Sequence, residues 1–227
     1  IKGRIYSEWF GKTIINSDKR FSYEEAQLLI ENKKTKIDKE VALEKKEYSV
    51  TEEILQAILG LNIIAKSLRN ERMKKGALSF DKVEVGFSLN SKKEPTGIRL
   101  KESKDANKLV EEFMLLANKK VAEYIKRKKP AKSFIYRVHD HPDDDKIKNL
   151  KDIVSSFGYK LDTDNKNLNK SLNNLFLQIK GKPEQNMIDT LTIRSMSKAV
   201  YTTENIGHYG LAFDSYSHFT SPIRRYP

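Results

Sequence analysis

The sequence lacks several features that define common protein classes. It has no cysteine among its 227 residues, which excludes a disulfide framework, Cys-ligated zinc and a cysteine nucleophile. No apolar run approaches the roughly 18 residues that a membrane-spanning helix needs, and no signal peptide opens the chain. Hydrophobic residues make up only 38% of the sequence, a low share that still suffices for one sizeable core. These features predict a soluble protein of the cytoplasm.

Positive charge is what the sequence has in excess. It contains 43 Lys and Arg against 31 Asp and Glu, which gives a net charge of +12. The excess is spread over both halves of the chain rather than confined to a tail. A domain this basic favours polyanionic partners, nucleic acid first and an anionic membrane surface second.

The spacing of apolar residues predicts an α+β fold in which a mixed sheet packs with several helices. No internal repeat or low-complexity linker divides the chain, so we expect one folded domain. Residues 32–50 are predicted to be a mobile or surface-lying connection, and 160–174 a loop with a weak helix. The expected helices cover 22–31, 49–75, 104–128, 143–157 and 183–196, and the expected strands two segments within 1–23, then 77–89, 97–100 and 134–138.

The helix expected over 104–128 carries a stripe of polar residues. At 100° per residue, Asn107, Glu111 and Asn118 fall within about 40° of one another. Such a stripe makes either hydrogen bonds between packed helices or the wall of a polar pocket, and the spacing leaves both open. Another face, which includes Glu112 and Lys119, is predicted to face solvent.

Two histidines and four aspartates lie close together between His139 and Asp145. His and carboxylate groups are good ligands for divalent metals, so a metal site is one interpretation. The other is a helix start, because Pro142 followed by three aspartates is typical of a first helical turn. We favour the helix start, since consecutive acidic residues on a helix point in different directions.

The end of the chain, SHFTSPIRRYP, is dense in functional groups. Two prolines, Pro222 and Pro227, exclude a long regular helix and predict a turn with few conformers. Arg224 and Arg225 offer planar guanidinium groups that match phosphate oxygens, and the neighbouring hydroxyls and N–H groups can add donors. Phosphate binding and pairing of the arginines with carboxylates of the same fold both remain open from the residues alone.

The motif YGLAFDSYSHFTSPIRRYP at residues 209–227, preceded by VYTTENIGHYG at 200–210, resembles the signature of the ribonuclease II and ribonuclease R superfamily. The catalytic domain of that superfamily is called RNB, and the His-Phe-Thr form is most similar to ribonuclease R. Three further blocks resemble the same domain in the same order: GALSF at 76–80, ANKLVEEFMLLAN at 106–118 and YRVHD at 136–140. The resemblance covers essentially the whole chain.

The resemblance implies a processive, hydrolytic 3′→5′ exoribonuclease that releases nucleoside 5′-monophosphates from RNA with the help of Mg²⁺. By position, Phe80 resembles the aromatic residue that clamps the 3′-terminal base. Glu111, with Asn107 on the same stripe, resembles the residue that contacts the terminal ribose. Arg224 resembles the arginine that binds the scissile phosphate, and Tyr23 a tyrosine near the catalytic centre. Arg225, Ser221 and Thr220 are expected to add RNA contacts around Arg224.

One departure from the family pattern changes the expected activity. The family's metal-binding aspartates lie upstream of the region that residues 1–227 resemble, and the Asp residues at 140–145 do not occupy those positions. We therefore expect one partial RNB domain of a longer protein, without its aspartate cluster and flanking OB-fold domains, and with no metal ligands of its own. It should bind the 3′ end of single-stranded RNA but not cleave it.

Two alternatives remain. The first is a catalytically dead, RNA-binding member of the same family. The second is an unrelated phosphoesterase that uses His139 and the acidic run. The sequence leaves the oligomeric state open.

Overall fold

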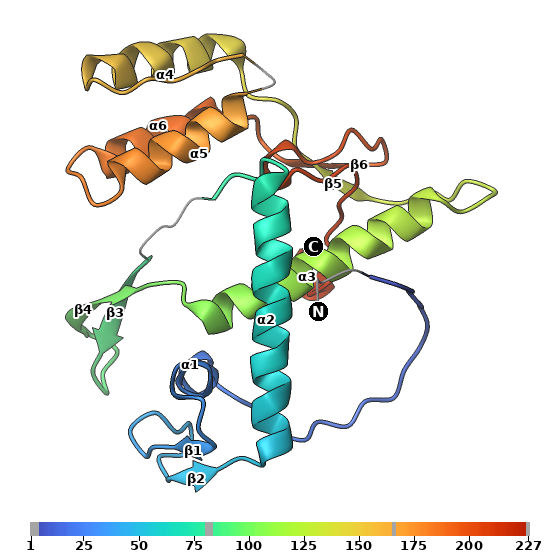
Figure 1. Ribbon diagram of the computed structural model, residues 1–227, viewed down its shortest axis with the longest axis vertical. Coiled ribbons are helices and arrows are strands. Elements are labelled where there is room, and N and C mark those ends of the chain that lie inside the picture. Colours follow the sequence, from blue (N-terminus) through green and yellow to red (C-terminus); the bar gives the residue numbers. More distant parts are fainter. Residues whose placement is uncertain (1–4, 80–83, 165–166, 226–227) are drawn as a thin grey trace. The chain divides into compact units, whose positions relative to one another are not determined.

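The computed structural model describes residues 5–79, 84–164 and 167–225 (Figure 1). The strands form small antiparallel pairs, β1 with β2, β3 with β4 and β5 with β6, which together with the helices confirms the α+β class. Within the described ranges no helix is long and apolar enough to cross a membrane. The elements are α1 (Tyr23–Asn32), β1 (Lys36–Ile37), β2 (Tyr48–Ser49), α2 (Glu52–Lys74), β3 (Glu84–Leu89), β4 (Pro95–Lys101), α3 (Asp105–Lys126), β5 (Tyr136–Val138), α4 (Asp144–Ser156), α5 (Leu168–Ile179), α6 (Gln185–Ser195), β6 (Val200–Thr202) and the 3₁₀ turns η1 (Tyr209–Leu211) and η2 (Pro222–Arg224).

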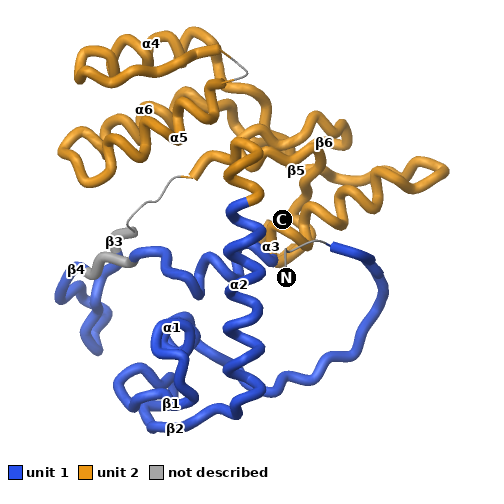
Figure 2. Tube along the Cα trace, viewed as in Figure 1, with its two compact units in different colours: residues 1–70, 81–113 blue, residues 71–80, 114–227 orange. Residues whose placement is uncertain are grey.

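The chain divides into two compact units (Figure 2). Unit 1 comprises residues 1–70 and 81–113, and unit 2 comprises 71–80 and 114–227. The long helices α2 and α3 each begin in unit 1 and end in unit 2: the boundary between the units falls after residue 70 in α2 and after residue 113 in α3.

The start of unit 1 is organised by one buried carboxylate, Glu25. Ser22 caps α1 and forms a capping box with Glu25, which confirms the helix predicted from residue 22. The Glu25 side chain also accepts hydrogen bonds from the Leu43 backbone N–H (2.9 Å) and the Tyr48 hydroxyl (3.0 Å). Burial opposes ionisation of Glu25, but these hydrogen bonds outweigh it and lower the pKa of the carboxyl group.

The connection over 32–50 is therefore more ordered than its composition predicted. Its short strands pair with each other, and Ile37 and Ala42 are fully buried beside Leu29 and Leu55. The prediction of a mobile or surface-lying segment was wrong here. A few buried apolar residues are enough to order a lysine-rich segment when a buried acceptor, here the Glu25 carboxylate, also binds its backbone.

The two strands predicted within residues 1–23 are absent from the described part of that segment. Trp9 is 73% exposed and Ile14 is entirely exposed, and no strand forms over residues 5–22. Alternating apolar residues form a stable strand only when another strand pairs with them. The described residues offer this segment no such partner.

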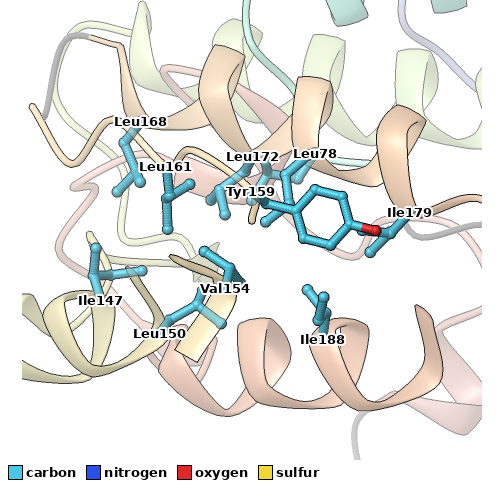
Figure 3. Packing of buried hydrophobic residues seen from close by; sticks show 11 residues of the cluster. Leu78, Ile147, Leu150, Val154, Tyr159, Leu161, Leu168, Leu172, Ile179 and Ile188 are labelled. Carbon is cyan, nitrogen blue, oxygen red and sulfur yellow. The ribbon is translucent and has the colours of Figure 1, made fainter. Parts of the chain in front are cut away.

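The main hydrophobic core lies in unit 2, where α4, α5 and α6 pack together (Figure 3). Helix α5 contributes Leu168, Leu172, Leu175 and Ile179, whose 4, 3, 4 spacing places all four on one buried face. The weak helix predicted here is thus a central core element that extends to residue 179. The prediction underestimated this helix because it weighed the many asparagine and lysine residues and not the regular spacing of the apolar ones.

Candidate functional site

The C-terminal motif folds into the turn that its prolines predicted. Ser221 adopts the left-handed conformation (φ 56°, ψ 51°), and Pro222 opens the 3₁₀ turn η2. The Arg225 backbone N–H donates to the Pro222 carbonyl at 2.9 Å, which closes the turn. Arg224 is exposed at its end. The turn therefore presents an arginine to solvent on a backbone with little freedom.

Hydrogen bonds to other elements of unit 2 hold the segment that leads into this turn. The Arg137 backbone N–H donates to the Tyr216 carbonyl at 2.9 Å, and the buried Ser217 hydroxyl donates to the Ile135 carbonyl at 2.7 Å. Asn118 of α3 accepts hydrogen bonds from Phe219 and Thr220. The tail is thus fixed to β5 and α3 immediately before Ser221.

A cluster of cationic and aromatic side chains lies upstream of the same turn. The guanidinium group of Arg137 lies 4.5 Å from the centre of the Tyr201 ring, and the Tyr201 hydroxyl lies 2.6 Å from Nδ1 of His218. Burial, followed by the positive charges of Arg225 and Arg137, lowers the pKa of His218 to about 4. Positive charge therefore comes from the arginines while His218 stays neutral at pH 7.

The sequence did not single out Arg137, Tyr201 or His218 as site residues. Arg137 and Tyr201 meet because they are paired residues of β5 and β6, two strands that lie far apart in the sequence. The local signal was membership of the blocks that resemble the RNB domain: Arg137 lies in YRVHD, Tyr201 in VYTTENIGHYG and His218 in the C-terminal motif.

Arg225 combines a half-buried side chain with an unused donor. Its Nε atom is buried and has no hydrogen-bond partner among the described residues. A buried donor of this kind is costly unless an acceptor satisfies it, and phosphate or carboxylate oxygens are strong acceptors. Among the described residues, no carboxylate pairs with the Arg225 Nε, so the structure does not support the alternative in which this group binds a carboxylate of the same fold.

The polar stripe of α3 divides into different environments. Asn118 is 3% exposed and hydrogen-bonded, whereas Glu111 is exposed. The side-chain oxygen of Asn107 accepts from the Lys104 backbone N–H at 3.2 Å, so it stabilises the start of the helix. The stripe is therefore partly structural, through Asn118 and Asn107, and partly accessible, through Glu111.

The solvent-facing surface predicted for α3 was wrong at Glu112. This residue is 3% exposed, and its carboxylate lies 3.8 Å from Nη1 of Arg69 on α2. Glu112 is buried because α2 packs against it and supplies Arg69 as a cationic partner. The apolar pattern of α3 alone does not reveal such a neighbour. The two helices line a cavity of about 200 Å³ in unit 1, formed by Asn62, Ala65, Lys66, Arg69, Asp105, Lys108, Leu109 and Glu112.

The predicted site residues fall into three groups. Thr220, Ser221, Arg224 and Arg225 lie together in unit 2. Unit 1 holds Asn107 and Glu111 on α3 and Tyr23, the first residue of α1, which is 46% exposed. Phe80 lies outside the described residues.

The acidic run after His139 begins a helix, as we favoured. The Asp143 side chain caps α4 by accepting from the backbone N–H groups of Asp145 and Lys146, both at 3.1 Å. Nδ1 of His139 accepts from the Gly210 N–H (3.0 Å), so Nε2 carries the proton and donates to the Ser197 carbonyl (2.9 Å). Both ring nitrogens are thus engaged by backbone groups, which argues against His139 as a catalytic group or metal ligand.

We expect acid to destabilise unit 2 through its buried histidines, chiefly His139 and His208, with His218 acting in the same direction. Burial lowers the pKa of His208 from 6.5 to about 3, and burial also lowers that of His139. Below about pH 6.5 the unfolded chain binds protons at these histidines more readily than the folded chain does, so unfolding becomes easier as the pH falls. The free energy of unfolding falls by at most about 1.4 kcal/mol per pH unit for each histidine. Urea denaturation between about pH 7.5 and 5, above the carboxylate range, measures this loss.

The variant His208→Gln provides the control for this prediction. It removes one proton-binding group, so its stability should decline less steeply over the same pH range. A wild-type stability that is flat between pH 6.5 and 5 would contradict the account.

Comparison with known proteins identifies the family. The family model for the RNB domain matches residues 1–227. The chain belongs to the RNB family. Its relative ribonuclease R of Aquifex aeolicus is 34% identical over 216 residues, which cover 95% of this chain and 29% of the relative. This RNB chain therefore spans less than a third of that protein's length.

Solved structures share the fold of this RNB chain. Mycoplasma genitalium RNase R in complex with ribose methylated single-stranded RNA matches with a TM-score of 0.76 at 22% identity, over 90% of this chain and 30% of that one. Yeast Ssd1, described as a pseudonuclease, matches with a TM-score of 0.51 at 23% identity, over 73% of this chain and 21% of that one. The family resemblance predicted from the motifs is confirmed.

Proposed function

We propose that residues 1–227 form the part of a processive, hydrolytic 3′→5′ exoribonuclease that binds the 3′ end of single-stranded RNA. The full protein would release nucleoside 5′-monophosphates. Family membership, the name of the Aquifex aeolicus relative and the net charge of +12 support this proposal. The observation that carries it is the fixed turn at Ser221–Arg225, which exposes Arg224 beside the unsatisfied Nε of Arg225.

In this proposal the turn binds the RNA backbone. Arg224 binds the scissile phosphate, because its planar guanidinium group can donate two parallel hydrogen bonds and balance the charge that develops on the phosphate oxygens. Arg225 makes a neighbouring phosphate contact, and Ser221 and Thr220 add polar contacts. All four residues lie within six positions of one another, so one rigid element can contact adjacent groups of the RNA backbone.

Other positions contact the terminal nucleotide in this proposal. Phe80 stacks on the 3′-terminal base, a contact that tolerates any sequence. Glu111, exposed on α3, accepts hydrogen bonds from the terminal ribose hydroxyls, with Asn107 nearby on the same helix, and so helps to distinguish RNA from DNA. Tyr23 is proposed to act at the catalytic centre, on the strength of its resemblance to the family's tyrosine alone.

The proposed reaction implies Mg²⁺, which polarises the phosphate and activates water when it is bound. The residues that the structure describes do not fit this ion, since they hold no group of three or more His, Cys, Asp or Glu side chains placed to share it. We therefore propose that the ligands of this ion lie outside residues 1–227. On this proposal the isolated chain binds RNA without cleaving it.

The alternative is a family member that binds RNA but lacks catalysis altogether. The fold also occurs in Ssd1, which is described as a pseudonuclease, so the fold alone does not decide the matter. Both possibilities require the same RNA-binding turn. They differ only in whether a metal-binding aspartate cluster belongs to the full protein.

The test of RNA binding is a salt titration with a fluorescently labelled single-stranded RNA. We expect the logarithm of the association constant to fall linearly with the logarithm of salt concentration, with a slope of about −0.7 for each phosphate contacted. The matching single-stranded DNA should bind more weakly, because it lacks the 2′-hydroxyl groups. Binding that is absent at low salt, or equal for RNA and DNA, would contradict the proposal.

A further inference from the structure

We propose that Asn118 is a positioning residue that holds Arg224 in place for phosphate binding. This inference rests on the function proposed above and extends it to a residue that makes no RNA contact of its own. It is carried by four hydrogen bonds that join Asn118 to the segment just before the arginine turn.

The amide group of Asn118 bonds to three successive parts of the tail. Its oxygen accepts from the backbone N–H groups of Phe219 (3.0 Å) and Thr220 (2.8 Å), and from the Thr220 hydroxyl (3.1 Å). Its nitrogen donates to the Tyr216 hydroxyl at 3.1 Å. Asn118 is 3% exposed, so water does not compete freely for these groups.

These hydrogen bonds replace secondary structure where the tail has none. Residues 216–220 belong to no helix or strand, so their backbone N–H groups need acceptors from elsewhere. One side-chain oxygen on the long helix α3 supplies acceptors for two adjacent N–H groups. The helix thus fixes the backbone at Thr220.

The path from Thr220 to Arg224 has little freedom. Ser221 is held in the left-handed conformation, Pro222 has a fixed φ, and η2 continues to Arg224. A backbone fixed at Thr220 therefore fixes the direction from which the Arg224 side chain extends. Loss of the Asn118 oxygen would free this backbone while leaving the arginine itself intact.

The test compares Asn118→Leu with Asn118→Asp in this chain. Leu has a similar size but no polar group, whereas Asp keeps an oxygen in the same place and can accept from the Tyr216 hydroxyl as well. In Asn118→Leu, amide hydrogen exchange at Phe219 and Thr220 should become at least about tenfold faster, because both N–H groups lose their acceptor. In Asn118→Asp their protection should remain. If Asn118→Leu does not fold, Asn118→Ser takes its place, since its side chain is too short to reach the two N–H groups.

Binding of single-stranded RNA gives the second readout. Asn118→Leu should weaken the affinity about five- to tenfold, because a contact that was preorganised must now be ordered on binding. In a chain that already carries Arg224→Ala, the same substitution should change the affinity by less than about twofold, since the residue being positioned is gone.

Three results would overturn the inference. The first is unchanged exchange at Phe219 and Thr220 in a folded Asn118→Leu chain. The second is an unchanged RNA affinity of Asn118→Leu while Arg224→Ala weakens binding, and the third is full additivity of the two substitutions. If Arg224→Ala itself leaves RNA binding unchanged, the proposed function fails, and the inference fails with it.

Discussion

Replacing Arg224 with alanine should weaken the binding of single-stranded RNA about tenfold to a hundredfold, which corresponds to about 1.5–3 kcal/mol for hydrogen bonds to a charged group. The side chain is exposed on a fixed turn, so its removal should not affect folding. The slope of the salt dependence should also become shallower by about 0.7, because one phosphate contact is lost. Fluorescence anisotropy over a range of salt concentrations measures both quantities.

The matched control is Arg194→Ala. Arg194 lies at the exposed end of α6, and its loss changes the net charge by the same amount. It should reduce RNA affinity only slightly, through the general field of the protein. Arg224→Lys should fall between wild type and Arg224→Ala, since lysine keeps the charge but lacks the planar donor pair. Equal losses for Arg194→Ala and Arg224→Ala would mean that only overall charge matters.

Replacing Leu172 with alanine should destabilise the fold by about 2–5 kcal/mol, the range seen when a large buried side chain leaves a cavity. Leu172 is fully buried in the core between α4, α5 and α6, where its neighbours come from several helices (Figure 3). The rigid packing around it limits how far the site can collapse. The midpoint of urea denaturation measures the loss, provided that the slope of the transition is unchanged.

The same helix supplies the control, Leu177→Ala. Leu177 is 74% exposed on α5, so its truncation should change the free energy of unfolding by less than about 0.5 kcal/mol. Because both substitutions remove the same atoms from one helix, their difference isolates burial from helix propensity. Similar losses at Leu172 and Leu177 would contradict the buried face that we assign to α5.

Features governed by neighbouring residues in the sequence were predictable. The helix α3 follows from its apolar spacing, and the start of α4 from Pro142 and the aspartates that follow it. The turn at Ser221–Arg225 follows from the fixed geometry of Pro222. In each case the deciding interaction lies within a few positions along the chain.

Features governed by distant residues were not predictable in the same way. The buried state of Glu112 depends on Arg69 of another helix, and the lack of strands over residues 5–22 depends on the lack of a pairing partner in the described chain. Asn118 was recognised as part of a polar stripe, but its contacts with Tyr216 and Thr220 join positions 98 and 102 residues apart. A helical pattern shows which side a residue faces, not what it meets there.

The most direct test of the account is the fate of a 5′-labelled single-stranded RNA incubated with this chain, once with Mg²⁺ and once with EDTA. The account predicts that the RNA is bound in a salt-sensitive manner and keeps its full length under both conditions, because we propose that the metal ligands of the enzyme lie outside residues 1–227. Shortening of the RNA from its 3′ end that requires Mg²⁺ would contradict this, since it would mean that the chain carries its own metal ligands.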